Sequence, residues 1–195
     1  MPAEPADQLS RALDATERIL LAVRDEQWDA PTPCTEWKVR DVVNHVVNGN
    51  TLFTRVLHGE PPAPARVLTG AGPELVGAYR DSAAAVLGAF REPGVLERVF
   101  TLPIGPVPGI VALHLRITEM LVHGWDVARA IGYAADFPAD LAEQELVFSR
   151  AKLAELPPGR MPFAPPQPVA PDAPAIGRLA ACLGRSVAAE APGQP

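Results

Sequence analysis

Residues 109–132 read GIVALHLRITEMLVHGWDVARAIG, with apolar side chains on nearly every side of the helix that this periodicity predicts. A helix that is apolar all round normally lies at the centre of its domain. Glu119 and His123 nevertheless stand four residues apart on one face of it. Because an unpaired carboxylate is costly to bury, these two side chains need a partner. The segment therefore predicts a central helix with a polar site built into it.

Further segments with helical periodicity are separated by proline- and glycine-rich breaks. Helices are predicted at residues 6–26, 35–58, 74–90, 138–156 and 173–183. We expect Thr35 to cap the second of these, with Glu36 in its first turn. Residues 99–107 break the helical pattern and predict a small β-hairpin. The fold class is therefore all-α, a bundle of at least four helices with a short β excursion.

Length and composition bound the domain organisation and the partners. The 195 residues are enough for one domain with an ordinary core. We expect residues 6–156 to form the helical bundle and the proline-rich residues 157–195 to form a C-terminal extension with one short helix. A net charge of −6 disfavours nucleic acids and anionic membrane surfaces. No apolar run approaches the roughly 20 residues of a membrane span.

The compartment follows from the cysteines and the N-terminus. Cys34 and Cys182 are the only cysteines, which favours reduced thiols over a disulfide framework. The acidic N-terminus lacks the apolar core of a signal peptide. We therefore expect a cytoplasmic protein, monomeric or homodimeric. Its low lysine content is typical of a GC-rich genome, such as an actinobacterial one.

A metal ion would satisfy Glu119 and His123 if another segment supplied a third ligand. His58 stands at a predicted helix end, where it suits the helix dipole. His114 precedes His123 by nine residues, so it faces the other side of the helix. His45, flanked by valines on a helix that should be buried, is the remaining candidate.

Helical bundles build metal sites from glutamate and histidine on facing helices. His45, Glu119 and His123 would suit zinc with one open position, and nickel, cobalt or iron would also accept them. Helix spacing alone does not show that the two helices face each other. The alternative is a structural ion pair of Glu119 with Arg116 or Arg129.

Several familiar catalytic motifs are missing from the chain. The ligand order differs from the His-Glu-x-x-His motif of zinc proteases, and no glutamate between the ligands is available as a general base. Gly-x-Ser-x-Gly, Gly-x-Gly-x-x-Gly and P-loop motifs are absent. These absences weaken the hydrolase, dinucleotide-binding and phosphotransfer interpretations.

Two stretches resemble the DinB-like metal-binding helical bundles, and within them the mycothiol-dependent maleylpyruvate isomerase group of actinobacteria. They are WDAPTPCTEW at 28–37, leading into RDVVNH at 40–45, and EMLVHGWD at 119–126. The resemblance covers residues 8 to 155 or so and implies a DinB-like four-helix bundle. It also implies that His45, Glu119 and His123 are metal ligands, with zinc as the first choice of metal.

The resemblance implies a chemistry as well. Characterised relatives use the metal to bind a low-molecular-weight thiol, mycothiol, as thiolate, and then add or transfer it to an electrophile. Metal coordination can deprotonate a thiol that is otherwise mostly protonated at neutral pH. We therefore expect a metal-dependent thiol transferase or isomerase. A metal-binding or sensory protein without turnover stays open as an alternative, as does hydrolysis through metal-activated water.

Helical spacing nominates supporting residues. Arg116 lies three residues before Glu119, and Asn48 three residues after His45, so both are candidate catalytic and thiol-binding residues. Asp41 or Asn48 could orient the ring of His45.

Two further residues have competing interpretations. Asp126 could orient His123, although a pair with Arg129 is the commoner arrangement. Cys34 is interpreted as a structural thiol, because no histidine or lysine is evidently its partner in the sequence.

Overall fold

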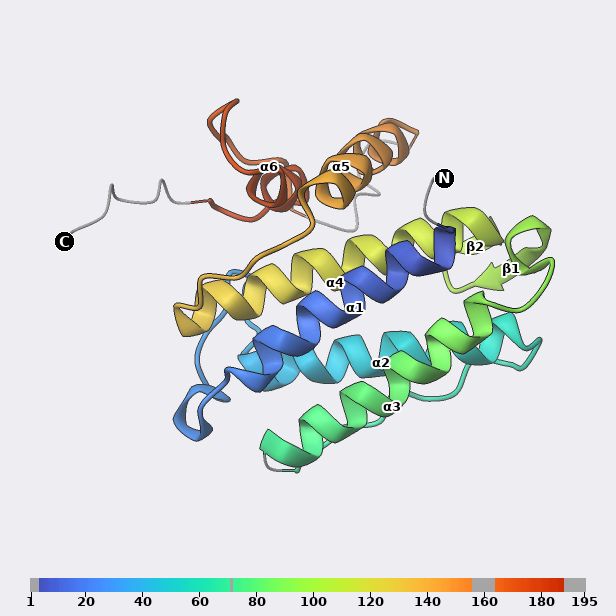
Figure 1. Cartoon of the computed structure of the whole chain (residues 1–195), viewed down its shortest axis with the longest axis horizontal. Coiled ribbons are helices and arrows are strands. Elements are labelled where there is room, and N and C mark those ends of the chain that lie inside the picture. The colour runs from blue at the N-terminus through green and yellow to red at the C-terminus, as the bar shows by residue number, and fades with distance from the viewer. Residues whose placement is uncertain (1–3, 71, 156–163, 188–195) are drawn as a thin grey trace. The chain divides into compact units, whose positions relative to one another are not determined.

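The computed structural model describes residues 4–70, 72–155 and 164–187. The chain divides into two compact units, Met1–Asp136 and Phe137–Pro195. In the first unit, four helices form a bundle: α1 (Pro5–Leu21), α2 (Val39–Leu57), α3 (Gly72–Phe90) and α4 (Gly109–Ile131). Helix α4 packs on α1 and α2, and α3 packs on the same two helices (Figure 1). The expected all-α bundle is confirmed.

Helix α4 supplies much of the core, as its sequence predicts. Ile117, Met120 and Leu121 have no solvent exposure, and burying an aliphatic side chain of this size stabilises the fold by about 1.5–3 kcal/mol. The hydroxyl of Thr16 on α1 donates a hydrogen bond to the Met120 carbonyl oxygen, at 3.0 Å. This bond fixes α1 against the turn of α4 that carries Glu119.

The small β-hairpin is also confirmed. Strand β1 (Val99–Leu102) pairs antiparallel with β2 (Gly105–Pro108), with Leu102 opposite Gly105. Gly105 adopts a φ of 115°, which favours glycine at the end of this tight connection. The hairpin leads directly into α4. Two short 3₁₀ helices, η1 (Asp25–Gln27) and η2 (Val95–Glu97), complete the elements described in this unit.

The start of α2 differs from the expectation. The helix begins four residues after Thr35, so Thr35 is not its cap. Instead, the Lys38 backbone N–H donates to the Asp41 carboxylate at 3.0 Å, within a capping box. Residues 34–37 form a separate turn that a backbone hydrogen bond of 3.0 Å closes. Asp41, expected as a candidate to orient His45, is therefore occupied at the helix N-terminus.

Glu36 in this turn has a φ of 73°, a conformation that favours glycine. We expect Glu36→Gly to stabilise the protein by about 1 kcal/mol, because glycine adopts this φ without the steric cost. Urea unfolding of the variant would measure the gain. As a control, Glu4→Gly replaces a glutamate with an ordinary φ of −60° and should give no gain. Equal effects of the two substitutions would contradict strain at Glu36.

The second unit contains α5 (Ala139–Ala154) and α6 (Ala175–Cys182), close to the predicted helices. The Gln167 backbone N–H donates to the Ala181 carbonyl at 2.9 Å, which ties the segment before α6 to that helix. The domain boundary expected at residues 156–157 lies outside the described residues and stays a prediction. No helix within the described ranges is long and apolar enough to cross a lipid bilayer.

Candidate metal centre

Helices α2 and α4 bring together the three side chains that the sequence nominated as metal ligands. His45 Nε2 lies 2.8 Å from Glu119 Oε2, and His123 Nε2 lies 3.4 Å from the same oxygen. One ligand atom from each residue lies within 4.8 Å of the other two. Ligand atoms around a tetrahedral zinc ion stand about 3.4 Å apart. The three donors therefore fit one ion.

The second nitrogen of His123 has its own partner. His123 Nδ1 lies 3.0 Å from Asp126 Oδ2, and the Asp126 side chain is fully buried. A carboxylate at this nitrogen favours the tautomer with the proton on Nδ1, which leaves the Nε2 lone pair for a metal. Asp126 thus occupies the position of an orienting residue for His123.

The cluster opens toward solvent on one side. The exposed fraction of the side chain is 40% for His45, 26% for Glu119 and 6% for His123. The Trp37 ring stacks on His123, with centroids 5.8 Å apart, and lies 4.8 Å from the ring of His45. Trp37 therefore covers the imidazoles, while the side of His45 gives access to a small molecule.

The ionisable groups of the cluster shift one another's pKa values. Burial alone would raise the pKa of the Glu119 carboxyl, but the imidazoles of His123 and His45 outweigh it and hold this pKa well below its ordinary value. Burial alone would lower the pKa of His123, but hydrogen bonds with Asp126 and Glu119 raise it above its ordinary value. Without metal, the site therefore holds an ionised glutamate and favours a protonated His123.

This raised pKa makes a prediction about the metal-free protein. Stabilisation from charged His123 is complete below the unfolded-state pKa of 6.5 and is lost as the pH rises through the higher folded-state pKa. We expect the thermal midpoint of metal-free protein to fall as the pH rises above about 6.5. The His123→Ala variant should show a flatter profile in the same scan. Parallel profiles would contradict the stated environment of His123.

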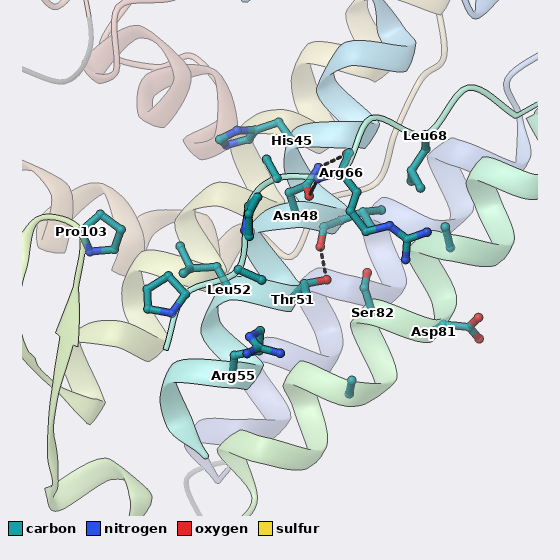
Figure 2. Close-up of a pocket in the computed structure, with 18 residues that line it drawn as sticks. His45, Asn48, Thr51, Leu52, Arg55, Arg66, Leu68, Asp81, Ser82 and Pro103 are labelled. Carbon is teal, nitrogen blue, oxygen red and sulfur yellow. Dashed lines mark hydrogen bonds between the residues drawn. The ribbon is translucent and has the colours of Figure 1, made fainter. Parts of the chain in front are cut away.

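Asn48 is engaged with a neighbouring segment. Its Nδ2 donates to the Arg66 carbonyl at 2.8 Å, and its Oδ1 accepts from the Arg66 N–H at 2.7 Å. Asn44, one turn earlier, contacts Leu68 in the same two-way manner, at 3.2 and 2.7 Å. These bonds hold the extended residues 60–70, here called the strap, across α2 (Figure 2). Whether Asn48 also binds a thiol stays a prediction.

A cavity of about 660 Å³ lies beneath and beside the strap, and His45 is part of its lining. This volume lies within the range typical of small-molecule sites. The walls come from α2, α3, the strap and the hairpin connection (Figure 2). Labelled lining residues include His45, Asn48, Leu52, Arg55, Arg66, Ser82 and Pro103. His45, one of the three candidate ligands, therefore adjoins a space large enough for a small molecule.

Arg116, the other candidate catalytic and thiol-binding residue, is buried beside the cluster. Its side chain is only 2% exposed, and Nη2 lies 3.9 Å from Glu119 Oε2. This distance suits an ion pair but is too long for a hydrogen bond. Glu119 therefore lies close to Arg116 and also belongs to the cluster of candidate ligands, so the two interpretations are compatible. Direct contact of Arg116 with a thiol stays a prediction.

The sequence interpretation missed the position of Cys34. Its sulfur, a ring nitrogen of His123 and a carboxylate oxygen of Asp126 lie within 4.8 Å of one another. A histidine is therefore close to this thiol, contrary to the premise of the structural interpretation. One indication in the sequence that Cys34 belongs near the site is that Cys34 and Trp37 both lie in the stretch that precedes α2. No spacing in the sequence linked either residue to His123.

Comparison with known proteins gives concordant results. The family model described as the mycothiol maleylpyruvate isomerase N-terminal domain matches residues 9–128. Proteins from two strains of Mycobacterium tuberculosis, each described as uncharacterized, are 38% identical over 187 residues, covering 94% of this chain and 99% of each relative.

Two solved structures share the fold. They are crystal structures of the mycothiol-dependent maleylpyruvate isomerase and of a mutant of it. The TM-scores are 0.57 and 0.60, with 20% and 18% identity respectively. Each alignment covers 74% of this chain and 68% of the other. At this identity the likeness concerns the fold alone.

Proposed function

Because the chain belongs to the mycothiol maleylpyruvate isomerase N-terminal domain family, we propose that it is a divalent-metal protein that uses a low-molecular-weight thiol. The observation that carries the proposal is the convergence of His45, Glu119 and His123, with His45 also lining a cavity. Zinc suits this donor set best, and nickel, cobalt or iron are the other choices.

The chain's own residues have distinct roles in this proposal. Two imidazole nitrogens and one carboxylate oxygen would hold the ion, and Asp126 would keep His123 in the coordinating tautomer. The ion supplies Lewis acidity, which lowers the pKa of a coordinated thiol and makes it nucleophilic at neutral pH. The cavity beside His45 would hold the remainder of the thiol and the electrophile.

The proposed reaction is transfer of the thiol sulfur to an electrophilic carbon, or reversible addition that isomerises a conjugated substrate. Mycothiol is the proposed thiol, because the family is named for it and the similar crystal structures are of a mycothiol-dependent enzyme. The relatives from Mycobacterium tuberculosis supply no further choice of electrophile. The electrophile is therefore best sought with a general alkylating probe.

A thiol panel tests this proposal. Mycothiol, bacillithiol, glutathione and coenzyme A are each mixed with monobromobimane, whose bromide leaves when sulfur attacks its methylene carbon. We expect zinc-loaded protein to accelerate the reaction of mycothiol most, and chelator-treated protein and His45→Ala to lose this acceleration. If the protein binds zinc but accelerates none of the four thiols, the catalytic proposal fails and a non-catalytic metal-binding role takes its place.

A further inference from the structure

Arg116 is a buried cation with unused hydrogen-bonding capacity. The residue is 1% exposed, and within the described part of the chain neither Nε nor Nη2 has a hydrogen-bond partner. Glu119 Oε2 lies 3.9 Å from Nη2, which is too far for a hydrogen bond. A buried charge that lacks hydrogen bonds is costly to the fold.

Two residues of α2, Phe53 and Gly49, surround part of this guanidinium. Arg116 lies over the Phe53 ring, with its guanidinium carbon 5.3 Å from the ring centroid. A Cβ atom at Gly49 would lie only 2.2 Å from Arg116 Nη1. Glycine inside a helix costs about 1 kcal/mol relative to alanine. The chain therefore accepts a weaker α2 at Gly49, where the missing side chain leaves room for the cation.

Arg116 changes the net charge around the candidate metal ligands. The positive charge of Arg116 offsets the negative charge of Glu119, and Asp126 contributes one further carboxylate through His123. With both histidines neutral as ligands, a divalent ion then leaves the centre with a net positive charge. Without Arg116 the same centre would be neutral overall. An anionic ligand at the open position is therefore favoured more strongly in the first case.

We propose that Arg116 is a positioning residue that, by offsetting the charge of Glu119, makes the open position of the metal centre select an anionic donor, such as a thiolate sulfur, over a neutral one. This inference rests on the proposed function, because it takes the three-ligand metal centre as its premise. It goes beyond that proposal by assigning ligand selectivity to a residue that is not one of the three candidate metal ligands.

Cobalt(II) provides a coloured probe of the site. Azide serves as the anionic probe and imidazole as the neutral probe of the open position, and the cobalt absorption bands report each titration. For Arg116→Met we expect azide to bind about tenfold more weakly, with imidazole binding changed less than about twofold. Cobalt itself should bind as tightly as in the unaltered protein or tighter, because a nearby positive charge has been removed.

Two further variants control for charge and position. Arg116→Lys keeps the charge and should retain most of the azide affinity. Arg80→Met removes an exposed arginine that pairs with Glu17 on the surface, and should change neither titration. An apolar replacement of a buried charge is often neutral or stabilising, so the methionine variant is expected to fold.

Gly49→Ala gives an independent route to the same result. The added methyl group must displace the Arg116 guanidinium, so azide binding should again weaken more than imidazole binding. Gly77→Ala is the matched control, because a Cβ atom at this helical glycine meets nothing within 4 Å. If Arg116→Met does not fold, the comparison of Gly49→Ala with Gly77→Ala tests the inference instead.

The possible failures are distinguishable. If the unaltered protein takes up no cobalt, the proposed function fails and this inference falls with its premise. If cobalt binds normally but azide affinity is unchanged in Arg116→Met, only the inference is overturned. A joint loss of cobalt, azide and imidazole binding would show a structural role for Arg116, and would also overturn it.

Discussion

Replacing His123 by alanine is expected to abolish uptake of divalent metal. The substitution removes the most buried of the three candidate ligands and leaves only His45 and Glu119, whose side chains are 40% and 26% exposed. Two ligands are fewer than the three protein ligands of a catalytic zinc site. Titration calorimetry with zinc, together with metal analysis of the dialysed protein, would measure the loss.

His114→Ala is the matched control for this experiment. Both histidines lie on α4, but His114 is nine residues earlier and is not among the residues whose ligand atoms converge. The His114 variant should keep its metal. Equal losses in the two variants would refute the assignment of the helix faces, and with it the proposed ligand set.

Removing the carboxylate of Asp126 is expected to weaken metal binding by about 10–100-fold without abolishing it. In Asp126→Ala, His123 Nδ1 loses the acceptor that lies 3.0 Å away. The ring is then no longer held in the tautomer that presents the Nε2 lone pair. Competition with a chromophoric chelator would give the zinc affinity of the variant relative to the unaltered protein.

Asp41→Ala separates this effect from a general loss of stability. The Asp41 carboxylate accepts a hydrogen bond from the backbone of Lys38, the N-cap residue of α2, and its removal should cost about 1 kcal/mol of folding free energy. It should leave the zinc affinity unchanged, because Asp41 contacts the Lys38 backbone rather than a candidate ligand. A zinc affinity for Asp126→Ala equal to that of Asp41→Ala would contradict the orienting role.

The central helix and its polar pair could be predicted because both are local features. Continuous apolar character predicted burial of α4, and the four-residue spacing put Glu119 and His123 on one face. Elimination among four histidines left His45. The contact of His45 on α2 with Glu119 on α4 depends on how the two helices pack. The spacing of residues within one helix contains no information about that packing.

The supporting contacts were less predictable, because they depend on loops. Cys34 and Trp37 reach His123 through a turn with an unusual φ at Glu36, whereas propensity favoured a helix start there. The strap can contact both Asn44 and Asn48 because the two spacings agree. Four helical residues rise about 6 Å, which is close to the rise of two extended residues such as Arg66 to Leu68. Helical periodicity alone gives no sign of such a match.

Metal content is the most direct test of the account. Protein purified without chelators, from cells supplied with zinc, should contain about one equivalent of divalent metal per chain, held by His45, Glu119 and His123. The account predicts that this equivalent is lost on chelation and regained on adding zinc. Less than about a tenth of an equivalent, both before and after zinc is supplied, would contradict it.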